Sequence, residues 1–246
     1  MSLRICLITI GARQPGVSSI HWFRKDLRLH DNPSLIASIK NCSSFFPVYI
    51  LDMEACRRSR ISANRWNFLC ECLHDLDTQL RSIGSRLYVV RGRAMEALPR
   101  LFWEWKATRL TFESDNEPAG RQRDAAVEGV AAKLGVEVIR HNSHLLYDID
   151  DVKDANDGEI PLEQEKFLAS LESMNRPSIP EKPVDKSSLR ACVTWQPQKE
   201  HSSMYDVPNL TEFGVKDERL APARRYWKGG EKEGLRRLGL FLRQVG

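Results

Sequence analysis

The sequence predicts an α/β protein built on a doubly wound, five-stranded parallel sheet. Five short runs rich in β-branched and aromatic residues alternate with four segments of helical periodicity between residues 17 and 140. The runs recur roughly every 25 to 30 residues, which is typical of consecutive βαβ units joined by right-handed crossovers. The run 45–51 is apolar throughout, as expected for a strand that helices cover on both faces of a sheet.

The first predicted strand, 17–23, ends in a strongly polar turn. The turn 24–31 carries six charged or imidazole side chains, and Asn32 and Pro33 follow it. These two residues are favoured at a helix start, so a short helix is predicted over 34–40. In an open parallel sheet such a turn faces the ligand-binding crevice. The alternative is that it is only a solvated charged surface.

The later elements of this domain follow from caps and apolar spacing. Ser62 is a good N-cap for a long amphipathic helix over 63–83, which Gly84 ends. Pro99 lies inside a second helical pattern, so that helix begins near Pro99 or kinks there. The remaining strands are expected over 86–90, 110–112 and 136–139, and the remaining helices over 95–105 and 118–134. The helical tryptophans are expected in the core: Trp66, Trp103 and Trp105.

The carboxyl-terminal third has a different character. A polar loop is expected over 141–161, a helix over 162–174, and a proline-rich interdomain linker over 175–208. A last helical pattern places Leu235, Leu238 and Leu242 on one stripe. Because that stripe has nothing to pack against, we expect a further domain after Gly246. The domain boundaries predicted are an N-terminal extension 1–16, an α/β domain 17–174, a linker 175–228, and the truncated start of a helical domain 229–246.

Composition excludes several classes of protein. The chain has 246 residues, of which 41% are hydrophobic and 28% charged, with no apolar run long enough to span a bilayer, so no membrane partner is expected. The net charge of +4 lies toward the carboxyl terminus and is too weak to establish nucleic-acid binding. Six scattered cysteines without a C-x-x-C pair indicate a reducing compartment and no zinc site. The first ten residues do not form a convincing signal peptide, although an organelle-targeting role stays open.

Common catalytic motifs are missing from the sequence. No glycine-rich phosphate loop follows the first strand, and Ser18 and Ser19 lack a G-x-S-x-G context. The histidines have no metal-ligand spacing, so structural roles are expected for them. Two polar turns are left, one at Arg24 and one spanning 113–118, at the ends of strands that flank the switch point of the sheet.

These two turns have two interpretations of equal weight. Arg24 and Arg123, opposed to Asp115 and Glu117, are suited to holding a planar ligand with polar edges. The same four side chains are equally suited to satisfying one another as an ion-pair network. The sequence leaves both interpretations open.

A family resemblance emerges from seven sequence blocks that occur in one order. They are H-W-F-R-K-D-L-R-L-H-D-N-P-S-L (21–35), V-Y-I-L-D (48–52), N-R-W-N-F-L (64–69), S-R-L-Y-V-V-R-G (85–92), R-L-T-F-E-S-D-N-E-P-A-G-R-Q-R-D-A-A-V (109–127), S-H-L-L-Y-D-I-D (143–150) and W-K-G-G-E (227–231). From about Ser19 onward the chain resembles the amino-terminal half of the cryptochrome/photolyase family. The similarity is greatest to the branch of animal-type cryptochromes and (6-4) photolyases.

The resemblance implies an α/β antenna domain, a long linker and an all-helical domain that binds FAD, the last of which would follow this chain. It implies a nuclear blue-light flavoprotein, with cytoplasm or an organelle as alternatives. Its full-length form would be a lyase that repairs ultraviolet-damaged DNA. The alternatives are a cryptochrome photoreceptor that regulates circadian transcription without repair, and a stand-alone partner-binding α/β module. No catalytic residue is assigned to this chain, which alone is expected to be inactive.

The resemblance also implies a role for the crevice. Family members that hold a light-harvesting deazaflavin imply cofactor-binding positions here at Arg24, Leu51, Asp52, Asp115, Glu117 and Arg123, and a folate antenna is the other possibility that the resemblance implies. In animal clock cryptochromes the corresponding cleft receives a clock or signalling protein instead. The chain departs from the family at Ala119, where an aromatic residue is usual.

Overall fold

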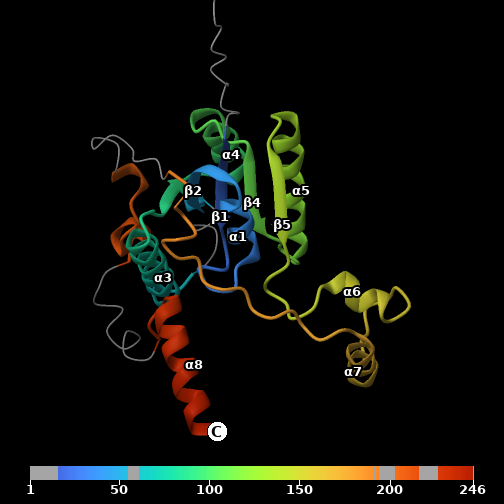
Figure 1. Cartoon of the computed structure of the whole chain (residues 1–246). Helices are drawn as coiled ribbons and strands as arrows, with labels where there is room; N and C mark the ends of the chain where they lie inside the picture. The colour runs from blue at the N-terminus through green and yellow to red at the C-terminus, as the bar shows by residue number, and fades with distance from the viewer. Residues whose placement is uncertain (1–15, 55–60, 191, 194–202, 216–226, 246) are drawn as a thin grey trace, which may run out of the picture.

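The computed structural model describes residues 16–54, 61–190, 192–193, 203–215 and 227–245. Five strands form one sheet in the order β3-β2-β1-β4-β5, and every neighbouring pair is parallel (Figure 1). They are β1 (Val17–Phe23), β2 (Cys42–Leu51), β3 (Tyr88–Arg91), β4 (Arg109–Glu113) and β5 (Glu137–His141). The predicted doubly wound α/β fold is therefore confirmed.

The four predicted helices between the strands lie within one residue of their expected bounds: α1 (Pro33–Ile39), α3 (Ala63–Ser82), α4 (Ala94–Glu104) and α5 (Pro118–Lys133). The side chains of Asn32 and Ser62 accept the capping hydrogen bonds expected at two of their N-termini, at 3.0 and 3.4 Å. Helix α4 runs through Pro99, so it does not begin at that residue.

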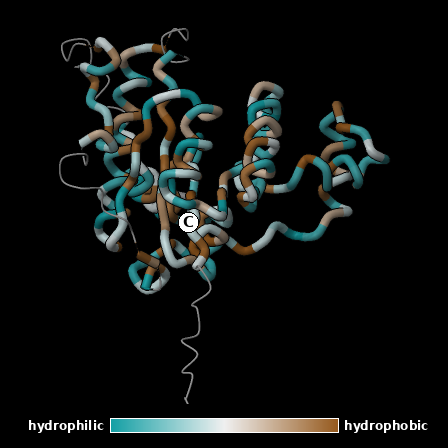
Figure 2. Tube along the Cα trace, turned by 90° about the horizontal axis from the view of Figure 1, so that it is seen from above, coloured by the Kyte–Doolittle hydropathy of each residue, from teal (hydrophilic) through white to brown (hydrophobic). Residues whose placement is uncertain are grey.

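Two apolar layers enclose the sheet. On one face, α4 and α5 pack against alternate side chains of the strands through Leu98, Leu101, Phe102, Val127 and Ala131. On the other face, α1 and α3 do the same through Leu35, Leu73, Leu76 and Leu80. Figure 2 shows the hydrophobic strands at the centre of this body. Burial on both faces explains why the strands read as apolar runs.

The three tryptophans expected in the core differ in their exposure to solvent. Trp66 and Trp105 are buried, as predicted, but Trp103 is 83% exposed. The prediction for Trp103 was wrong because α4 packs only one side on the sheet, the side that carries Leu98 and Leu101. Apolar character in a short helix does not by itself place every aromatic residue inside.

The proline-rich segment packs back onto the α/β domain. Val184 and Leu189 are buried in the layer beside α1 and α3. Val193 forms an isolated parallel bridge with Ser44, and β2 begins three residues before the predicted strand start at Phe45 because Cys42 and Ser44 pair with β1. This part of the expected linker therefore contributes to the core.

The carboxyl-terminal region forms further helices: α6 (Ile149–Asp154), α7 (Gln164–Ser173), η2 (Leu210–Phe213) and α8 (Glu231–Val245). The expected polar loop 141–161 contains α6, which was missed because this six-residue helix buries no side chain completely and begins at a cap by Asp148. Helices α6 and α7 project to one side of the sheet in both views (Figures 1 and 2). Predictions for residues 1–15, and for the cysteines at 6 and 56, lie outside the described residues.

Helix α8 leaves the α/β domain beside α3 (Figure 1). Its predicted stripe is exposed, with Leu235, Leu238 and Leu242 at 48%, 52% and 60%. Within the described ranges no helix combines the length and the apolar character needed to cross a membrane.

Candidate functional site

The topology brings the two predicted polar turns together. The order β2-β1-β4 makes the carboxyl ends of β1 and β4 the switch point of the sheet. Arg24 and Lys25 follow β1 directly, and Asp115 and Glu117 follow β4. The four side chains meet at this edge, where the sequence placed a crevice.

Arg24 is a buried partner of α5. Its guanidinium contacts the Asp124 carboxylate through two hydrogen bonds of 2.5 and 3.2 Å, and the two side chains are only 8% and 2% exposed. The guanidinium also lies 4.9 Å from the ring centres of Trp22 and Phe112. Burial lowers the pKa of Arg24 despite the opposing charge of Asp124. The bidentate pair therefore fixes α5 against the sheet.

Asp115 accepts hydrogen bonds from several directions. Lys25 Nζ and an Arg123 Nη each lie 3.0 Å from its carboxylate, and the backbone N–H of Glu117 lies at 3.1 Å. Burial favours the neutral acid, but the Glu117 N–H and Lys25 outweigh burial and lower the pKa of Asp115. A Cβ on Gly120 would lie 2.1 Å from Asp115 Cγ, so only glycine allows α5 to pack this closely.

The ion-pair interpretation of the turns is therefore correct for the charged side chains. Arg24 pairs with Asp124, Asp115 pairs with Lys25 and Arg123, and Lys25 also reaches Glu117 at 2.7 Å. Sequence reasoning placed Asp124 on this helix without giving it a role. Its position one turn after Gly120 on α5 was the available signal.

The remaining two predicted positions lie at the carboxyl end of β2. Leu51 is 1% exposed and belongs to the apolar layer beside α3. Asp52 follows it and is half-buried. Neither residue lines the cavity that opens next to Arg24 and Lys25.

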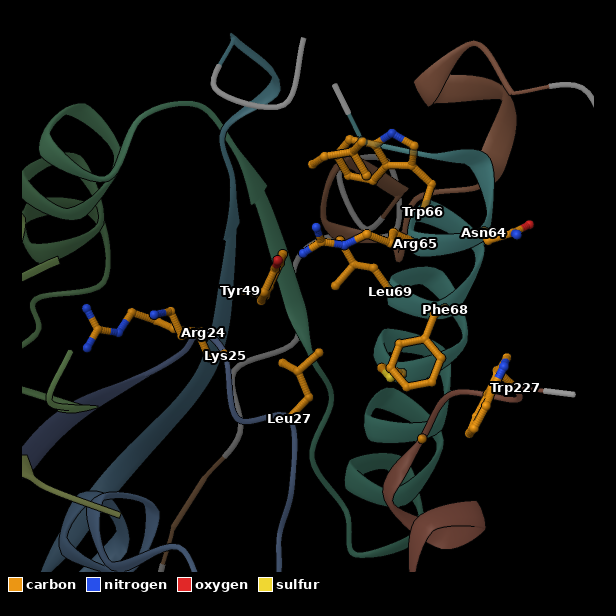
Figure 3. Close-up of a pocket in the computed structure, with 13 residues that line it drawn as sticks. Arg24, Lys25, Leu27, Tyr49, Asn64, Arg65, Trp66, Phe68, Leu69 and Trp227 are labelled. Carbon is orange, nitrogen blue, oxygen red and sulfur yellow. The ribbon is translucent and has the colours of Figure 1, made fainter. Parts of the chain in front are cut away.

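That cavity has a volume of about 760 Å³ and lies between the ends of β1 and β2 and helix α3 (Figure 3). Arg65 and Leu69 point from α3 toward Tyr49 on β2, while the Arg24 guanidinium points away from α3. The other lining residues are Lys25, Leu27, Ile61, Asn64, Trp66, Phe68, Cys72, Trp227 and Gly230. The α3 side of the cavity was missed, although 65, 68, 69 and 72 share one helix face by spacing.

The W-K-G-G-E block positions the far wall of the cavity. The Glu231 carboxylate accepts hydrogen bonds from the backbone N–H groups of Leu29 and His30 at 3.0 and 2.8 Å. A Cβ on Gly229 would lie 2.4 Å from the backbone oxygen of Phe68, so the block lies directly on α3. Trp227 is thereby held beside Phe68, and both rings are partly exposed to the cavity (Figure 3).

A second polar cluster consists of Asp26, Arg28, Glu113 and His144. Burial and the neighbouring Glu113 raise the pKa of Asp26 to about 6, against the opposing charge of Arg28. His144 Nε2 lies 2.9 Å from the Glu113 carboxylate. Across the described part of the chain, no group of three or more acidic, histidine or cysteine side chains is arranged to hold a metal ion.

The structure is a doubly wound α/β domain with a ligand-sized cavity between the ends of β1 and β2 and helix α3. The sequence model of the DNA photolyase family matches residues 19–184. The chain belongs to the DNA photolyase family, which includes the cryptochromes.

Curated relatives extend well beyond the chain. It is 44% identical to cryptochrome-2 of Gallus gallus over 224 residues, or 91% of this chain and 38% of that protein. It is 43% identical to cryptochrome-1 of Mus musculus over 227 residues, or 92% of this chain and 37% of that protein. The chain thus spans a little over a third of the length of these relatives.

Solved structures share the fold. A class III photolyase from Agrobacterium tumefaciens superposes with a TM-score of 0.75 at 23% identity, covering 94% of this chain and 45% of the photolyase. A cryptochrome from Synechocystis gives a TM-score of 0.72 at 20% identity, covering 92% and 46%. An archaeal photolyase from Sulfolobus tokodaii, solved with two FAD molecules, gives 0.64 at 24% identity, covering 89% and 45%.

Proposed function

We propose that the chain is the α/β antenna part of a blue-light flavoprotein, and that its cavity holds a planar aromatic ligand of the flavin or deazaflavin class. The observation that carries this proposal is the cavity itself. Its volume of about 760 Å³ lies within the usual range of about 300 to 1,000 Å³ for small-molecule sites. The Sulfolobus tokodaii photolyase, described as implying a novel light-harvesting cofactor, supports the ligand class.

The lining residues fit such a ligand. Phe68 and Trp227 present partly exposed rings, 45% and 70% accessible, that can stack on a planar ring system. Arg65 supplies positive charge for a phosphate or an acidic ring nitrogen, whereas Lys25 is already paired with Asp115 and Glu117. A bound chromophore of this class would absorb blue light and pass the excitation to a second flavin.

A titration of the full chain with FMN tests the cavity. We expect quenching of flavin fluorescence on binding, and at least a fivefold weaker affinity in Phe68→Ala and Trp227→Ala. Trp103→Ala removes an exposed tryptophan far along α4 and serves as the matched control. No binding at millimolar FMN, or equal affinity in all variants, would reject a flavin-class ligand in this cavity.

For the full-length protein we propose FAD binding by a helical domain, with two candidate activities in the nucleus. Light-driven repair of ultraviolet-damaged DNA is one, and photoreception with circadian regulation is the other. Identities of 42% to 44% to animal cryptochromes favour the second. A clock or signalling protein would then occupy the cavity in place of a chromophore.

Native protein recovered from its source with an antibody against α3 separates the two activities. A flavin spectrum together with blue-light repair of irradiated DNA supports repair. A flavin spectrum without repair supports photoreception. A colourless, monodisperse product of the length of this chain would instead support the stand-alone partner-binding module.

A further inference from the structure

Cys42 and Cys192 lie against each other although 150 residues separate them in the sequence. Their Sγ atoms are 2.8 Å apart, and both are free thiols. A disulfide has an S–S distance of about 2.05 Å, so less than about 1 Å of movement would join the two sulfurs. Neither thiol belongs to the crevice at the switch point.

The backbone fixes this pair on both sides. Val193 N donates to Ser43 O at 2.8 Å, and Phe45 N donates to Val193 O at 3.2 Å. Upstream, Leu189 is 7% exposed and packs in the layer beside α3. The two cysteines are therefore held in place by adjacent backbone pairing, and a bond between them needs no rearrangement of the chain.

The two thiols differ in their access to solvent. Cys42 is 4% exposed. Cys192 is half-buried and lines a surface pocket of about 490 Å³ with Lys186 and Arg190. The nearest carboxylate in sequence, Asp185, is engaged by the hydroxyls of the serines that follow it. The pocket therefore presents two cations around the outer sulfur and suits an anionic reagent.

Because Cys192 is the more exposed sulfur, it is the one that a reagent in the pocket reaches first, and the contact between the sulfurs acts in the same direction. The hydrogen bond from Cys42 lowers the pKa of Cys192, while burial opposes this effect. The same contact, together with burial, raises the pKa of Cys42. Cys192 Sγ also lies 3.4 Å from Cys42 O, to which it donates when protonated. The outer sulfur thus has the greater thiolate character, as expected of an attacking thiol.

We propose that Cys192 and Cys42 are a redox-active thiol pair that an anionic disulfide of the glutathione class oxidises. The Cys192 thiolate attacks one sulfur of the reagent, forms a mixed disulfide and releases one thiolate. Cys42 then gives up its proton to solvent, attacks Cys192 Sγ and releases the second thiolate. Two protein thiols become one disulfide, and the reagent is reduced to two thiols. The product bonds the segment around Cys192 covalently to the start of β2.

Peptide mapping of the full chain tests the bond. The reduced chain is treated with oxidised glutathione, alkylated, and digested with trypsin and with a protease that cleaves before aspartate, so that Cys42 and the cysteine at 56 fall on separate peptides. We expect peptide 41–51 linked to peptide 191–199, with the other thiols alkylated. Failure to find this link, or a link through other cysteines, would overturn the proposal.

Single substitutions test the order of events. In Cys42→Ser, Cys192 should accumulate as the glutathione mixed disulfide, whereas in Cys192→Ser the buried Cys42 should stay reduced. Cys70→Ser, on α3 and outside the cavity lining, is the matched control and should react like the original chain. If Cys42 reacts equally fast without Cys192, the proposed order is wrong. If Cys42→Ser does not fold, the transient mixed disulfide on the unaltered chain provides the same readout.

The charge of the pocket is tested separately. A Lys186→Gln, Arg190→Gln double variant should react at least threefold more slowly with oxidised glutathione. Its rate with neutral 2-hydroxyethyl disulfide should not change. Equal slowing with both reagents would show that the two cations do not recruit the oxidant.

Discussion

At the scale of single residues, the crevice is organised by pairs of opposite charge whose exposure differs widely. Arg24 and Asp124 are almost completely enclosed, whereas Arg123 is 39% and Glu117 is 73% exposed. Removing one partner of a buried pair leaves the other charge without compensation, while an exposed pair contributes little. The same residue types therefore have different energetic roles in one network.

Asp124→Ala should lower the free energy of unfolding by about 3 to 5 kcal/mol, because it strands the buried Arg24 charge. Glu117→Ala, at the exposed end of the network, should cost less than about 1 kcal/mol. Urea unfolding of both variants measures the difference. Similar losses in the two variants would mean that burial does not set the strength of these pairs.

Arg123→Ala should change the free energy of unfolding by no more than about 1 kcal/mol, because Lys25 continues to pair with Asp115 after the substitution. The affinity for FMN should not change, because Arg123 does not line the cavity beside α3. Thermal unfolding and the FMN titration are the two measurements. A loss of several kcal/mol would instead make Arg123 a structural partner of the same rank as Arg24.

Asp26 should give the chain a pH-dependent stability of unusual sign. Its native pKa of about 6 lies above the ordinary value of 3.8, so its contribution is complete below about pH 4 and is lost as the pH rises through 6. The buried His21, with a pKa lowered to about 3, acts in the opposite sense. The quantity to measure is therefore the free energy of unfolding of Asp26→Asn minus that of the unaltered chain, because the contribution of His21 cancels in this difference.

This difference in the free energy of unfolding should shift in favour of Asp26→Asn by about 2 kcal/mol between pH 4 and pH 6, out of a full effect of about 3 kcal/mol at about 1.4 kcal/mol per pKa unit. Denaturant unfolding at several pH values provides the data. A difference that stays constant over this window would show that Asp26 titrates normally in the folded chain.

At the scale of elements, helix α8 is attached through its first turn. The Glu231 carboxylate accepts hydrogen bonds from the turn after β1. Gly230 has a φ of +112°, and a Cβ at this position would lie 2.7 Å from Asp75 Cβ. Beyond this turn the helix has exposed leucines and internal ion pairs such as Glu233 with Arg236. The local attachment, and not an apolar interface, fixes where α8 begins.

Gly230→Ala should detach α8 without unfolding the sheet, because it strains the positive φ and forces the chain off α3. Hydrogen exchange should increase in residues 231–245 and stay unchanged in β1 and β4. Gly239→Ala is the matched control, since a Cβ there meets no neighbour within 4 Å. Equal exchange in the two variants would place the attachment of α8 elsewhere.

At the scale of the whole molecule, the chain has one well-packed body and several apolar surfaces without cover. The apolar side chains of the two layers around the sheet are buried. By contrast, Leu162 is 94% exposed, Ile179 90% and Leu242 60%, along the segment after β5 and on α8. The leucines of the α8 stripe share one helix face, and such an exposed apolar surface is typical of a contact with another domain or chain.

The isolated chain should therefore self-associate through α8. A Leu238→Glu, Leu242→Glu double variant should shift sedimentation toward the monomer, because it places charges on the exposed stripe. Trp103→Glu, on the equally exposed face of α4, is the control and should have a smaller effect. A monomeric unaltered chain at tens of micromolar would show that the stripe does not drive association.

Much of this architecture was predictable because its determinants are local. The strands are specified by their apolar runs, and the helices by caps such as Asn32 and Ser62 and by glycines that end them. The alternation of strands and helices along the chain specifies a parallel sheet. The ordered family blocks specified the family. Helix α6 was not predicted because a short polar helix has little apolar periodicity. The exposure of Trp103 was not predicted because the pattern does not show which face of α4 packs on the sheet.

The sequence by itself determined the fold class, the strand order at the switch point and the residues gathered there. Only the tertiary structure decided how those residues pair: Arg24 with Asp124, 100 positions apart, and Asp115 with Lys25 and Arg123. It also decided that Trp227 lines the cavity and that the Sγ atoms of Cys192 and Cys42 are in contact. The physical reason is that periodicity and caps act over a few residues, whereas pairing depends on which distant side chains share one small, dehydrated volume.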